Sequence, residues 1–303
     1  MICGGILDGT VFIHTNEKQR VGAIVSAYSM RRNSRRPADF DVRIIECKDY
    51  PFLQAHEGRP FLRDGTTRIW KNDDLQSFTP LRFMPPALTG FQGRAIVTDP
   101  DVFAVGDVHE LLTRDMGGKA ILCRERAGLK RYASSVMLLD CARLTHWHCE
   151  EQFEELFAMR RDYMDWISLR CEDAATIGLF EPEWNDFDVL TPATRLLHTT
   201  KRRTQPWKSG LPVDFTPSAR RLDHSLGGRL RRVARSLKGK RGPGAVYEPH
   251  PVPAVEEFFF QLLAECLDLG LVSEALLGAH MARDHIRHDA FERVAHARRR
   301  AAA

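Results

Sequence analysis

Residues 94–101 read RAIVTDPD, a short apolar run that ends in two acidic residues. The run is typical of a buried strand, and Gly90 and Gly93 favour a turn just before it. Two carboxylates spaced i and i+2 at a strand end can point to the same side and hold one hard divalent cation, so Asp99 and Asp101 are candidate metal ligands. A cation there would neutralise charge that develops on phosphate oxygens when a bond to a diphosphate breaks.

The Asp-x-Asp spacing occurs twice more, at 39–41 and at 186–188. The first of these precedes a predicted strand, at the edge where α/β sheets do not usually bind ligands. The second lies in a polar connection. Only residues 99–101 directly follow a buried strand at its carboxyl end, which favours a metal site there over the alternative, a surface turn built on Asp-Pro.

Apolar strands alternate with helical patterns along most of the chain. This alternation predicts an α/β domain with a mostly parallel or mixed sheet at 10–215, in which 48–79 is rich in loops. Beyond it we expect a basic amphipathic linker at 216–245 and a helical tail at 246–303. The expected strands lie at 11–13, 42–46, 94–98, 120–123, 136–139 and 194–197, the helices of the domain at 17–33, 107–112 and 149–159, and those of the tail at 256–269 and 272–283.

His198 ends another apolar run, again at the expected carboxyl edge of a strand. A lone histidine is more often a hydrogen-bonded structural residue than a ligand. If His198 joins Asp99 and Asp101, the site has oxygen and imidazole ligands, a mixed set that suits Mn²⁺ somewhat better than Mg²⁺. The following residues, 199–208, contain four cations, which can either grip a diphosphate or form a solvated basic loop.

Four segments, in this order, resemble glycosyltransferase family 8, the retaining GT-A enzymes that include glycogenin and bacterial lipopolysaccharide hexosyltransferases. They are 11–16, with a Thr-Asn pair; 81–85, with an arginine; 95–111, with the two aspartates; and 196–207, with a histidine and a later Pro-Trp pair. The resemblance implies a GT-A (Rossmann-like) single-domain nucleotide-sugar fold with a C-terminal helical extension. It also implies a UDP-sugar donor, Mn²⁺ or Mg²⁺ as cofactor, and retention at the anomeric carbon.

The resemblance also implies roles for individual residues. Asp99, Asp101 and His198 would hold the metal. Contacts to the nucleotide-sugar would come from Thr15, Asn16, Arg82, Pro100, Ser134, Lys201 and Trp207. Among these, the Thr-Asn pair would line the uridine pocket, and Arg82 with Lys201 would offset phosphate charge. The resemblance assigns no catalytic residue.

The chain departs from the family pattern at three places. Residues 133–135 read Ala-Ser-Ser where the family has Asn-Ser-Gly, so the amide that contacts the donor sugar is absent. Gln205 stands where the family has a lysine, and Lys201 or Lys208 is a candidate to replace that charge. The family's Asp-Gln pair, which touches the sugar, has no clear match, and the candidates for its acid are Asp162, Asp165 and Asp173.

Residues 226–241 combine apolar residues at helical spacing with many basic residues, which predicts a basic amphipathic helix. Attachment to an anionic membrane surface, where a lipid-linked acceptor would lie, is one function for it. The alternative is a helix packed on the domain with a solvated basic face. Nucleic-acid binding is disfavoured, because aromatic residues do not interleave with the charges and the net charge is only +4.

Three features bear on the compartment. The sequence has no apolar run of about 18 residues, and its N-terminus lacks the pattern of a secretory signal. Its seven cysteines are scattered and form no CxxC pair, which is typical of a reducing environment. We therefore expect a cytoplasmic protein with peripheral contact to the inner membrane face through 226–241.

These patterns together predict a Mn²⁺-dependent hexosyltransferase that moves a hexose from a UDP-sugar to a hydroxyl of a glycan or lipid-linked glycan. A non-catalytic nucleotide-sugar-binding protein is the first alternative, since the residues that choose the sugar depart from the family pattern. A sugar nucleotidyltransferase is the second. It needs a GxGTRL-like phosphate loop after the first strand, and the glycines at 4, 5 and 9 precede that strand.

Overall fold

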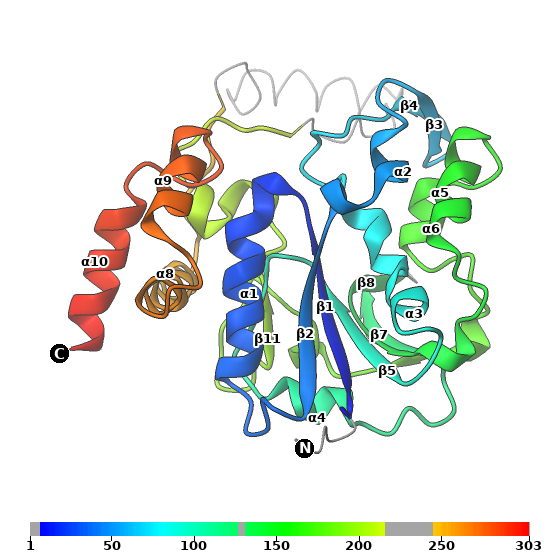
Figure 1. Ribbon diagram of the computed structural model, residues 1–303, viewed down its shortest axis with the longest axis horizontal. Coiled ribbons are helices and arrows are strands. Elements are labelled where there is room, and N and C mark those ends of the chain that lie inside the picture. The colour runs from blue at the N-terminus through cyan, green and yellow to red at the C-terminus, as the bar shows by residue number, and fades with distance from the viewer. Residues whose placement is uncertain (1–6, 127–130, 216–244, 303) are drawn as a thin grey trace, which may run out of the picture.

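The computed structural model describes residues 7–126, 131–215 and 245–302, and it confirms the predicted α/β class with a mixed sheet (Figure 1). β1 runs parallel to β2 and β5, and β7 runs parallel to β9. β8 is antiparallel to both of its neighbours. The strand order is β2 (Phe40–Glu46), β1 (Gly9–Thr15), β5 (Arg94–Thr98), β8 (Arg131–Asp140), β7 (Ile121–Arg126) and β9 (Ile177–Leu179).

The main helix of the domain is α1, Arg20–Arg32, which follows a 3₁₀ turn at Glu17–Gln19 and confirms the helix expected at 17–33. Asp107 caps the next expected helix as predicted, since its Oδ1 accepts the His109 N–H at 3.0 Å. The shorter helices are α2 (Pro51–Gln54), α3 (Pro85–Leu88), α4 (Val108–Leu112), α5 (Cys149–Phe157) and α6 (Tyr163–Ile167).

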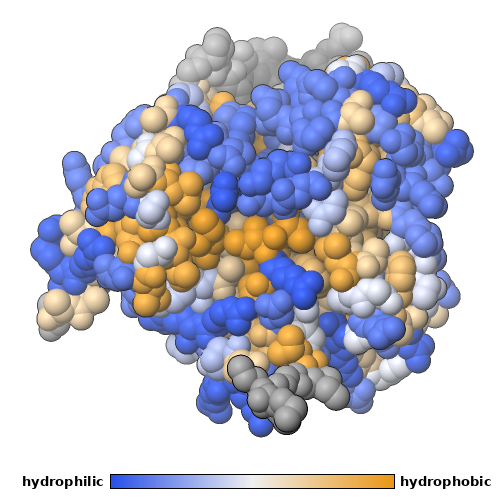
Figure 2. Space-filling model, viewed as in Figure 1, coloured by the Kyte–Doolittle hydropathy of each residue, from blue (hydrophilic) through white to orange (hydrophobic). Residues whose placement is uncertain are grey.

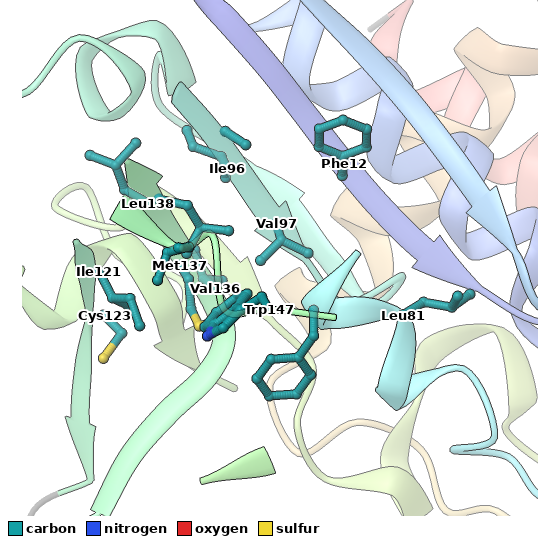
Figure 3. Close-up of a cluster of buried hydrophobic side chains, with 14 of the residues drawn as sticks. Phe12, Leu81, Ile96, Val97, Ile121, Cys123, Val136, Met137, Leu138 and Trp147 are labelled. Atoms are coloured by element: carbon teal, nitrogen blue, oxygen red, sulfur yellow. The ribbon is translucent and has the colours of Figure 1, made fainter. Parts of the chain in front are cut away.

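The hydrophobic core lies on the central strands. β1 and β5 are continuous apolar runs because both of their faces are covered, as is usual for parallel strands inside an α/β sheet. Figure 3 shows Val97 of β5 and Met137 of β8 close to the indole of Trp147, and Phe12 on the neighbouring strand β1. All four side chains are fully buried. This rigid centre holds the carboxyl end of β5 in place.

A second, smaller sheet brings the chemically important segments together. It consists of β10 (Asp186–Phe187), β11 (Leu196–His198) and β6 (Val102–Ala104) in that order. β6 begins directly after Asp101, and it pairs antiparallel with β11 so that His198 lies opposite Val102. Backbone pairing therefore delivers His198 to the loop that contains Asp99 and Asp101.

A hairpin stands where the sequence suggests only loops. β3 (Pro60–Arg63) and β4 (Thr66–Ile69) are antiparallel and are joined by Asp64 and Gly65, whose φ angles are 51° and 68°. Two positive φ values are what a tight two-residue hairpin turn requires, and Asp-Gly is a preferred pair for it. The Asp-Gly dipeptide at the centre of the 48–79 stretch was therefore the signal for this hairpin.

Three helices form the C-terminal part: α8 (Pro253–Asp268), α9 (Glu274–Ala282) and α10 (Ala290–Ala301). The first two confirm the helices expected at 256–269 and 272–283, whereas the third was not expected, because only Ala290 and Val294 of it are buried. The predicted linker lies outside the described residues except for its last position, and the predicted amphipathic helix at 226–241 lies wholly outside them. The division into domain, linker and tail stays a prediction.

The C-terminal helices share a second core with α1. Val21 and Val25 of α1 are buried together with Phe259 of α8, with Phe103 of β6 and with Trp207. Figure 2 shows hydrophobic residues gathered around this side of the molecule, between hydrophilic regions. Of the helices that the structure describes, none is long and apolar enough to cross a membrane.

Gly22 joins this second core to the aspartate loop. A Cβ at Gly22 would lie 3.1 Å from the carbonyl oxygen of Pro100 and 3.4 Å from the ring of Trp207. Only glycine lets the helix approach the Asp99–Asp101 turn so closely without displacing it. The position of that turn is therefore set by α1 and, through Trp207, by the packing of the C-terminal helices.

A contrasting glycine gives a test of the helix assignment. Gly278 lies inside α9, and a Cβ there would meet no heavy atom within 4 Å. We expect Gly278→Ala to raise the free energy of unfolding by about 0.5–1 kcal/mol, because alanine loses less conformational entropy than glycine on entering a helix. Chemical denaturation of both proteins measures this difference, and a destabilised variant would contradict α9 as described.

Candidate metal centre and substrate cavity

The structure brings Asp99, Asp101 and His198 together, as the sequence predicts. Each offers one ligand atom, and these atoms all lie within 4.8 Å of one another. The Asp99 N–H donates to the carbonyl of Ser135 at 3.0 Å, and the Thr199 N–H donates to the carbonyl of Asp101 at 3.0 Å. Both aspartates therefore lie on backbone that is fixed by neighbouring strands.

The orientation of His198 is set by Asn185. Asn185 donates its Nδ2 to Ser135 Oγ at 3.0 Å, so its Oδ1 lies toward His198 Nδ1 at 2.8 Å and accepts the proton of that nitrogen. The lone pair of Nε2 then points at Asp101 Oδ1, 3.3 Å away. Two acceptors at that separation repel unless a cation or a proton lies between them. A histidine whose second ring nitrogen is fixed by a buried acceptor has the orientation that metal-binding histidines have, which makes His198 a candidate ligand.

Asp99 has a different environment. Its Oδ1 lies 2.5 Å from Arg82 Nη2 and 2.9 Å from His14 Nε2. Burial alone would raise the pKa of Asp99, but the positive charge of Arg82 and the contact with His14 outweigh it and hold the pKa well below its usual range. Burial lowers the pKa of His14, and Asp99 offsets only part of that effect. Asp99 is therefore an ionised carboxylate at any physiological pH.

Arg82 has both of its terminal nitrogens engaged by the protein. Besides the ion pair with Asp99, its Nη1 donates to Ser134 Oγ at 2.6 Å, and Ser134 in turn donates to the carbonyl of Ile167. The resemblance predicts contacts to the nucleotide-sugar for Arg82 and Ser134, with Arg82 offsetting phosphate charge. Both do line the cavity described next, but their first role in the structure is to hold Asp99 in place.

The three candidate ligands line a cavity of about 530 Å³. This volume is within the range of small-molecule binding sites. Six of the predicted site residues line it: Arg82, Asp99, Pro100, Asp101, Ser134 and His198. Further lining residues, which were not among the predicted site residues, include Gln19, Arg63, Asp64, Arg68, Arg126, Tyr132, Ser135, Arg202 and Gln205.

Two predicted uridine contacts are not among the lining residues. Thr15 and Asn16 are buried at the end of β1, and Thr15 Oγ1 donates to the carbonyl of Asn16. The amide of Asn16 reaches the carbonyls of Asp74 and Leu75 at 3.1 and 3.4 Å and Ser77 Oγ at 3.1 Å. Residues 74–77 thus cover the Thr-Asn pair. Gln19, one turn further along, faces the cavity instead.

Trp207 and Lys201, two further predicted contacts of the nucleotide-sugar, do not line the cavity either. The indole of Trp207 is 0% exposed and lies 4.8 Å from the ring of Phe259, so it belongs to the core. Lys201 is exposed and does not line the cavity, and Lys208 is fully buried in an ion pair with Asp214 at 2.7 Å. The 3₁₀ turns at Arg202–Thr204 and Pro206–Lys208 direct other side chains of the loop toward the cavity.

Gln205, which stands where the family has a lysine, reaches the metal centre. Its Nε2 donates to Asp101 Oδ2 at 3.2 Å, and its Oε1 accepts from Gln19 Nε2 at 3.3 Å. The side chain that orients the Asp101 carboxylate is therefore a neutral amide. A positively charged side chain at this position would neutralise that carboxylate. The extra negative charge left at Asp101 favours a bound cation.

The three aspartates considered as sugar contacts have structural roles. Asp162 caps α6 and accepts the Gly65 N–H at 2.8 Å, and Asp165 pairs with Arg170 at 2.5 Å. Asp173 caps a 3₁₀ turn. The carboxylate beyond the metal centre that does line the cavity is Asp64, at the tip of the β3–β4 hairpin.

Comparison with known proteins gives distant similarities only. No family model matches the chain, and no curated protein matches it. Among solved structures, it is similar to the glycosyltransferase GlyE of Streptococcus pneumoniae TIGR4, with a TM-score of 0.48 and 14% identity over 88% of this chain. The chain spans 64% of the length of GlyE.

Two further structures are similar at the same level. One is the galactosyltransferase LgtC in complex with donor and acceptor sugar analogs, with a TM-score of 0.44, 12% identity, and coverage of 75% of this chain and 95% of LgtC. The other is mouse xyloside xylosyltransferase 1, with a TM-score of 0.42, 13% identity, and coverage of 65% of this chain and 98% of that one.

The hydrogen bond from His198 to Asn185 makes a specific prediction for metal binding. We expect Asn185→Ala to weaken Mn²⁺ binding by about 10–100-fold, because the imidazole loses the acceptor that fixes its tautomer and orientation. Asn185→Asp keeps an acceptor at this position and should bind Mn²⁺ far better than the alanine variant. Calorimetric titration with Mn²⁺ measures both, and equal affinities in the two variants would contradict the role of Asn185.

Proposed function

We propose that this protein is a metal-dependent glycosyltransferase that transfers a hexose from a UDP-sugar to a hydroxyl acceptor. The observation that carries the proposal is the group of Asp99, Asp101 and His198 at one end of the cavity, with the His198 lone pair facing a carboxylate. The order of the four sequence segments described above supports the choice of donor.

The donor set fits a divalent metal of the Mn²⁺ or Mg²⁺ class, since two carboxylates and one imidazole match the ligand preferences of Mn²⁺ in particular. Asp99, Asp101 and His198 would hold the ion. A bound cation supplies neutralisation of the negative charge on the diphosphate leaving group.

The residues around the ligands keep this site in one geometry. Arg82 and His14 fix Asp99, Gln205 fixes Asp101, and Asn185 fixes His198. Because each ligand has its own partner, little rearrangement is needed when charge develops on the substrate, which is how preorganised sites lower a barrier. Tyr132, Ser134 and Ser135, which also line the cavity, are the proposed surroundings of the sugar.

Three finer parts of the proposal rest on sequence patterns. Retention at the anomeric carbon follows from the family resemblance, and no residue is proposed as a nucleophile. The acceptor is proposed to be a glycan or lipid-linked glycan. Peripheral contact of a cytoplasmic protein with the inner membrane face is proposed for 226–241, as the composition of that segment suggests.

Asp101→Ala is the decisive variant for the metal role. We expect it to reduce Mn²⁺-dependent release of UDP from UDP-sugars by at least about 100-fold, since one of the three ligands is removed and k falls tenfold for every 1.4 kcal/mol of lost stabilisation. UDP release is measured with a panel of UDP-sugars, which also identifies the donor. The thermal unfolding temperature of the variant should stay close to that of the parent.

Asp41→Ala is a matched control. Asp41 also belongs to an Asp-x-Asp pair, but its partners are Arg31 and Arg43 and it lies on β2, outside the cavity. Its removal should leave UDP release unchanged. Unchanged turnover in Asp101→Ala would contradict the proposed function, and nucleotide-sugar binding without any UDP release by the parent protein would favour the non-catalytic alternative.

A further inference from the structure

A second cavity opens beside the first. It measures about 280 Å³ and lies between the β3–β4 hairpin, Tyr163 and the loop of Arg202. We call it the annexe. The annexe and the main cavity share the lining residues Arg63, Arg68, Gln76 and Arg202, so the two lie side by side. A molecule in the annexe would therefore lie next to the cavity that the candidate metal ligands line.

The walls of the annexe combine aromatic rings with positive charge. Phe61 packs edge-on against Trp70 and Tyr163, with ring centres 5.6 Å and 5.8 Å apart. These rings form a rigid apolar floor. Four cationic side chains line the space, Arg63, Arg68, Lys71 and Arg202, against the single carboxylate of Asp74. Asp74 already accepts the Gln76 N–H at 2.9 Å. The annexe thus carries a clear excess of positive charge.

Arg63 and Arg202 are held by aromatic rings and not by acids. The Arg63 guanidinium lies 4.7 Å from the centre of the Tyr163 ring, and that of Arg202 lies 5.5 Å from the centre of the Phe215 ring. Within the described part of the chain, neither forms a side-chain ion pair. Stacking fixes the plane of a guanidinium while its N–H groups remain free to bind a ligand at the edge.

This contrasts with arginines elsewhere in the described chain. Arg114 pairs with Glu181, and Arg170 pairs with Asp165, at 2.5 Å in each case. Burial lowers the pKa of Arg202 from its usual value, and although Asp74 and Asp101 offset part of this effect, the nearby charge of Arg63 adds to it. Two positive charges are therefore held close together in a partly buried space, which is unfavourable unless an anion joins them.

We propose that the annexe binds an anionic group, a phosphate monoester, carried by the acceptor substrate, through Arg63 and Arg202. This inference rests on the proposed glycosyltransferase function and names the chemical class of its second substrate. Two arginines present paired N–H donors that match the oxygens of a phosphate, and the apolar floor formed by Phe61 and Tyr163 accommodates the carbon skeleton next to it. The hydroxyl to be glycosylated would then extend toward the metal centre.

The test uses the full chain and glycerol 3-phosphate as the soluble probe. Calorimetric titration should show saturable binding to the protein, both without nucleotide and after saturation with UDP and Mn²⁺. Arg63→Gln and Arg202→Gln should each weaken the binding about tenfold or more, because a charge-assisted hydrogen bond is lost. Arg63→Lys should have an intermediate affinity, since it keeps the charge and loses the paired geometry.

Arg170→Gln is the control, because Arg170 is paired with Asp165 and does not line either cavity. Its affinity for the probe should equal that of the parent. Circular dichroism checks that every variant is folded. The proposal is overturned if the parent shows no saturable binding, if the arginine variants bind as well as the parent, or if UDP and Mn²⁺ abolish binding, which would assign the two arginines to the donor diphosphate.

A phosphate monoester can be soluble or part of a lipid. Co-sedimentation with phosphatidylcholine vesicles, with and without phosphatidic acid, distinguishes these sources. Binding to phosphatidic acid that depends on Arg63 and Arg202 indicates a lipid acceptor, and binding of the soluble probe alone indicates a free one; both support the proposal.

The UDP-release assay separates this inference from the proposed function. Normal Mn²⁺-dependent UDP release without phosphate binding supports the proposed glycosyltransferase function and contradicts the proposal of an anionic acceptor. Phosphate binding at the two arginines without UDP release from any UDP-sugar overturns the proposed function, and the acceptor role with it.

Discussion

The antiparallel pairing of β6 with β11 is the constraint on which the candidate site depends. It sets His198 opposite Val102, and Val102 directly follows Asp101. The imidazole of His198 therefore meets two carboxylates from a segment that lies much earlier in the chain. The register matters because a shift by one residue would turn His198 to the other face of the strand. The main sheet supplies the other half of this constraint, since β5 is buried on both faces and its carboxyl end cannot move independently.

The electrostatics of the cavity follow from how each acid is partnered. Asp99 lies against Arg82 and His14, whereas Asp101 has only the neutral amide of Gln205 and the imidazole of His198 beside it. The metal centre therefore keeps negative charge on the side of Asp101. Arg63 and Arg202 place positive charge where the two cavities adjoin.

The sequence predicted the parts of the fold that have a strong local pattern. Strands β1 and β5 are continuous apolar runs, α1 has a clear helical spacing, and Asp107 is a recognisable cap. The metal group was also predictable, because two acids at a strand end are a local signal. The hairpin was missed despite its Asp-Gly turn, and α10 was missed because very few of its side chains are buried. Local patterns such as these do not say which surface a short segment covers.

The residues around the metal group were harder to predict, since their roles depend on tertiary packing. No local sequence pattern indicates that Trp207 fills a hydrophobic core while Gln205, two positions earlier, contacts Asp101. In the same way, Arg202 faces the cavity and Lys201 does not, and Asn16 is covered by residues 74–77 that lie far away in the chain. The contribution of Asn185 depends on a hydrogen bond between two segments that are remote from each other in sequence, so no spacing could reveal it.

Gly22 has a consequence for how this protein can be divided. The side of that glycine on which a Cβ would stand meets both the backbone of Pro100, between the two aspartates, and the ring of Trp207, which is packed against α8. The C-terminal helices therefore belong to the packing that supports the Asp99–Asp101 turn. We expect proteolytic removal of these helices to uncover the indole and to loosen that support. A fragment that retains the group of Asp99, Asp101 and His198 would need the helices as well.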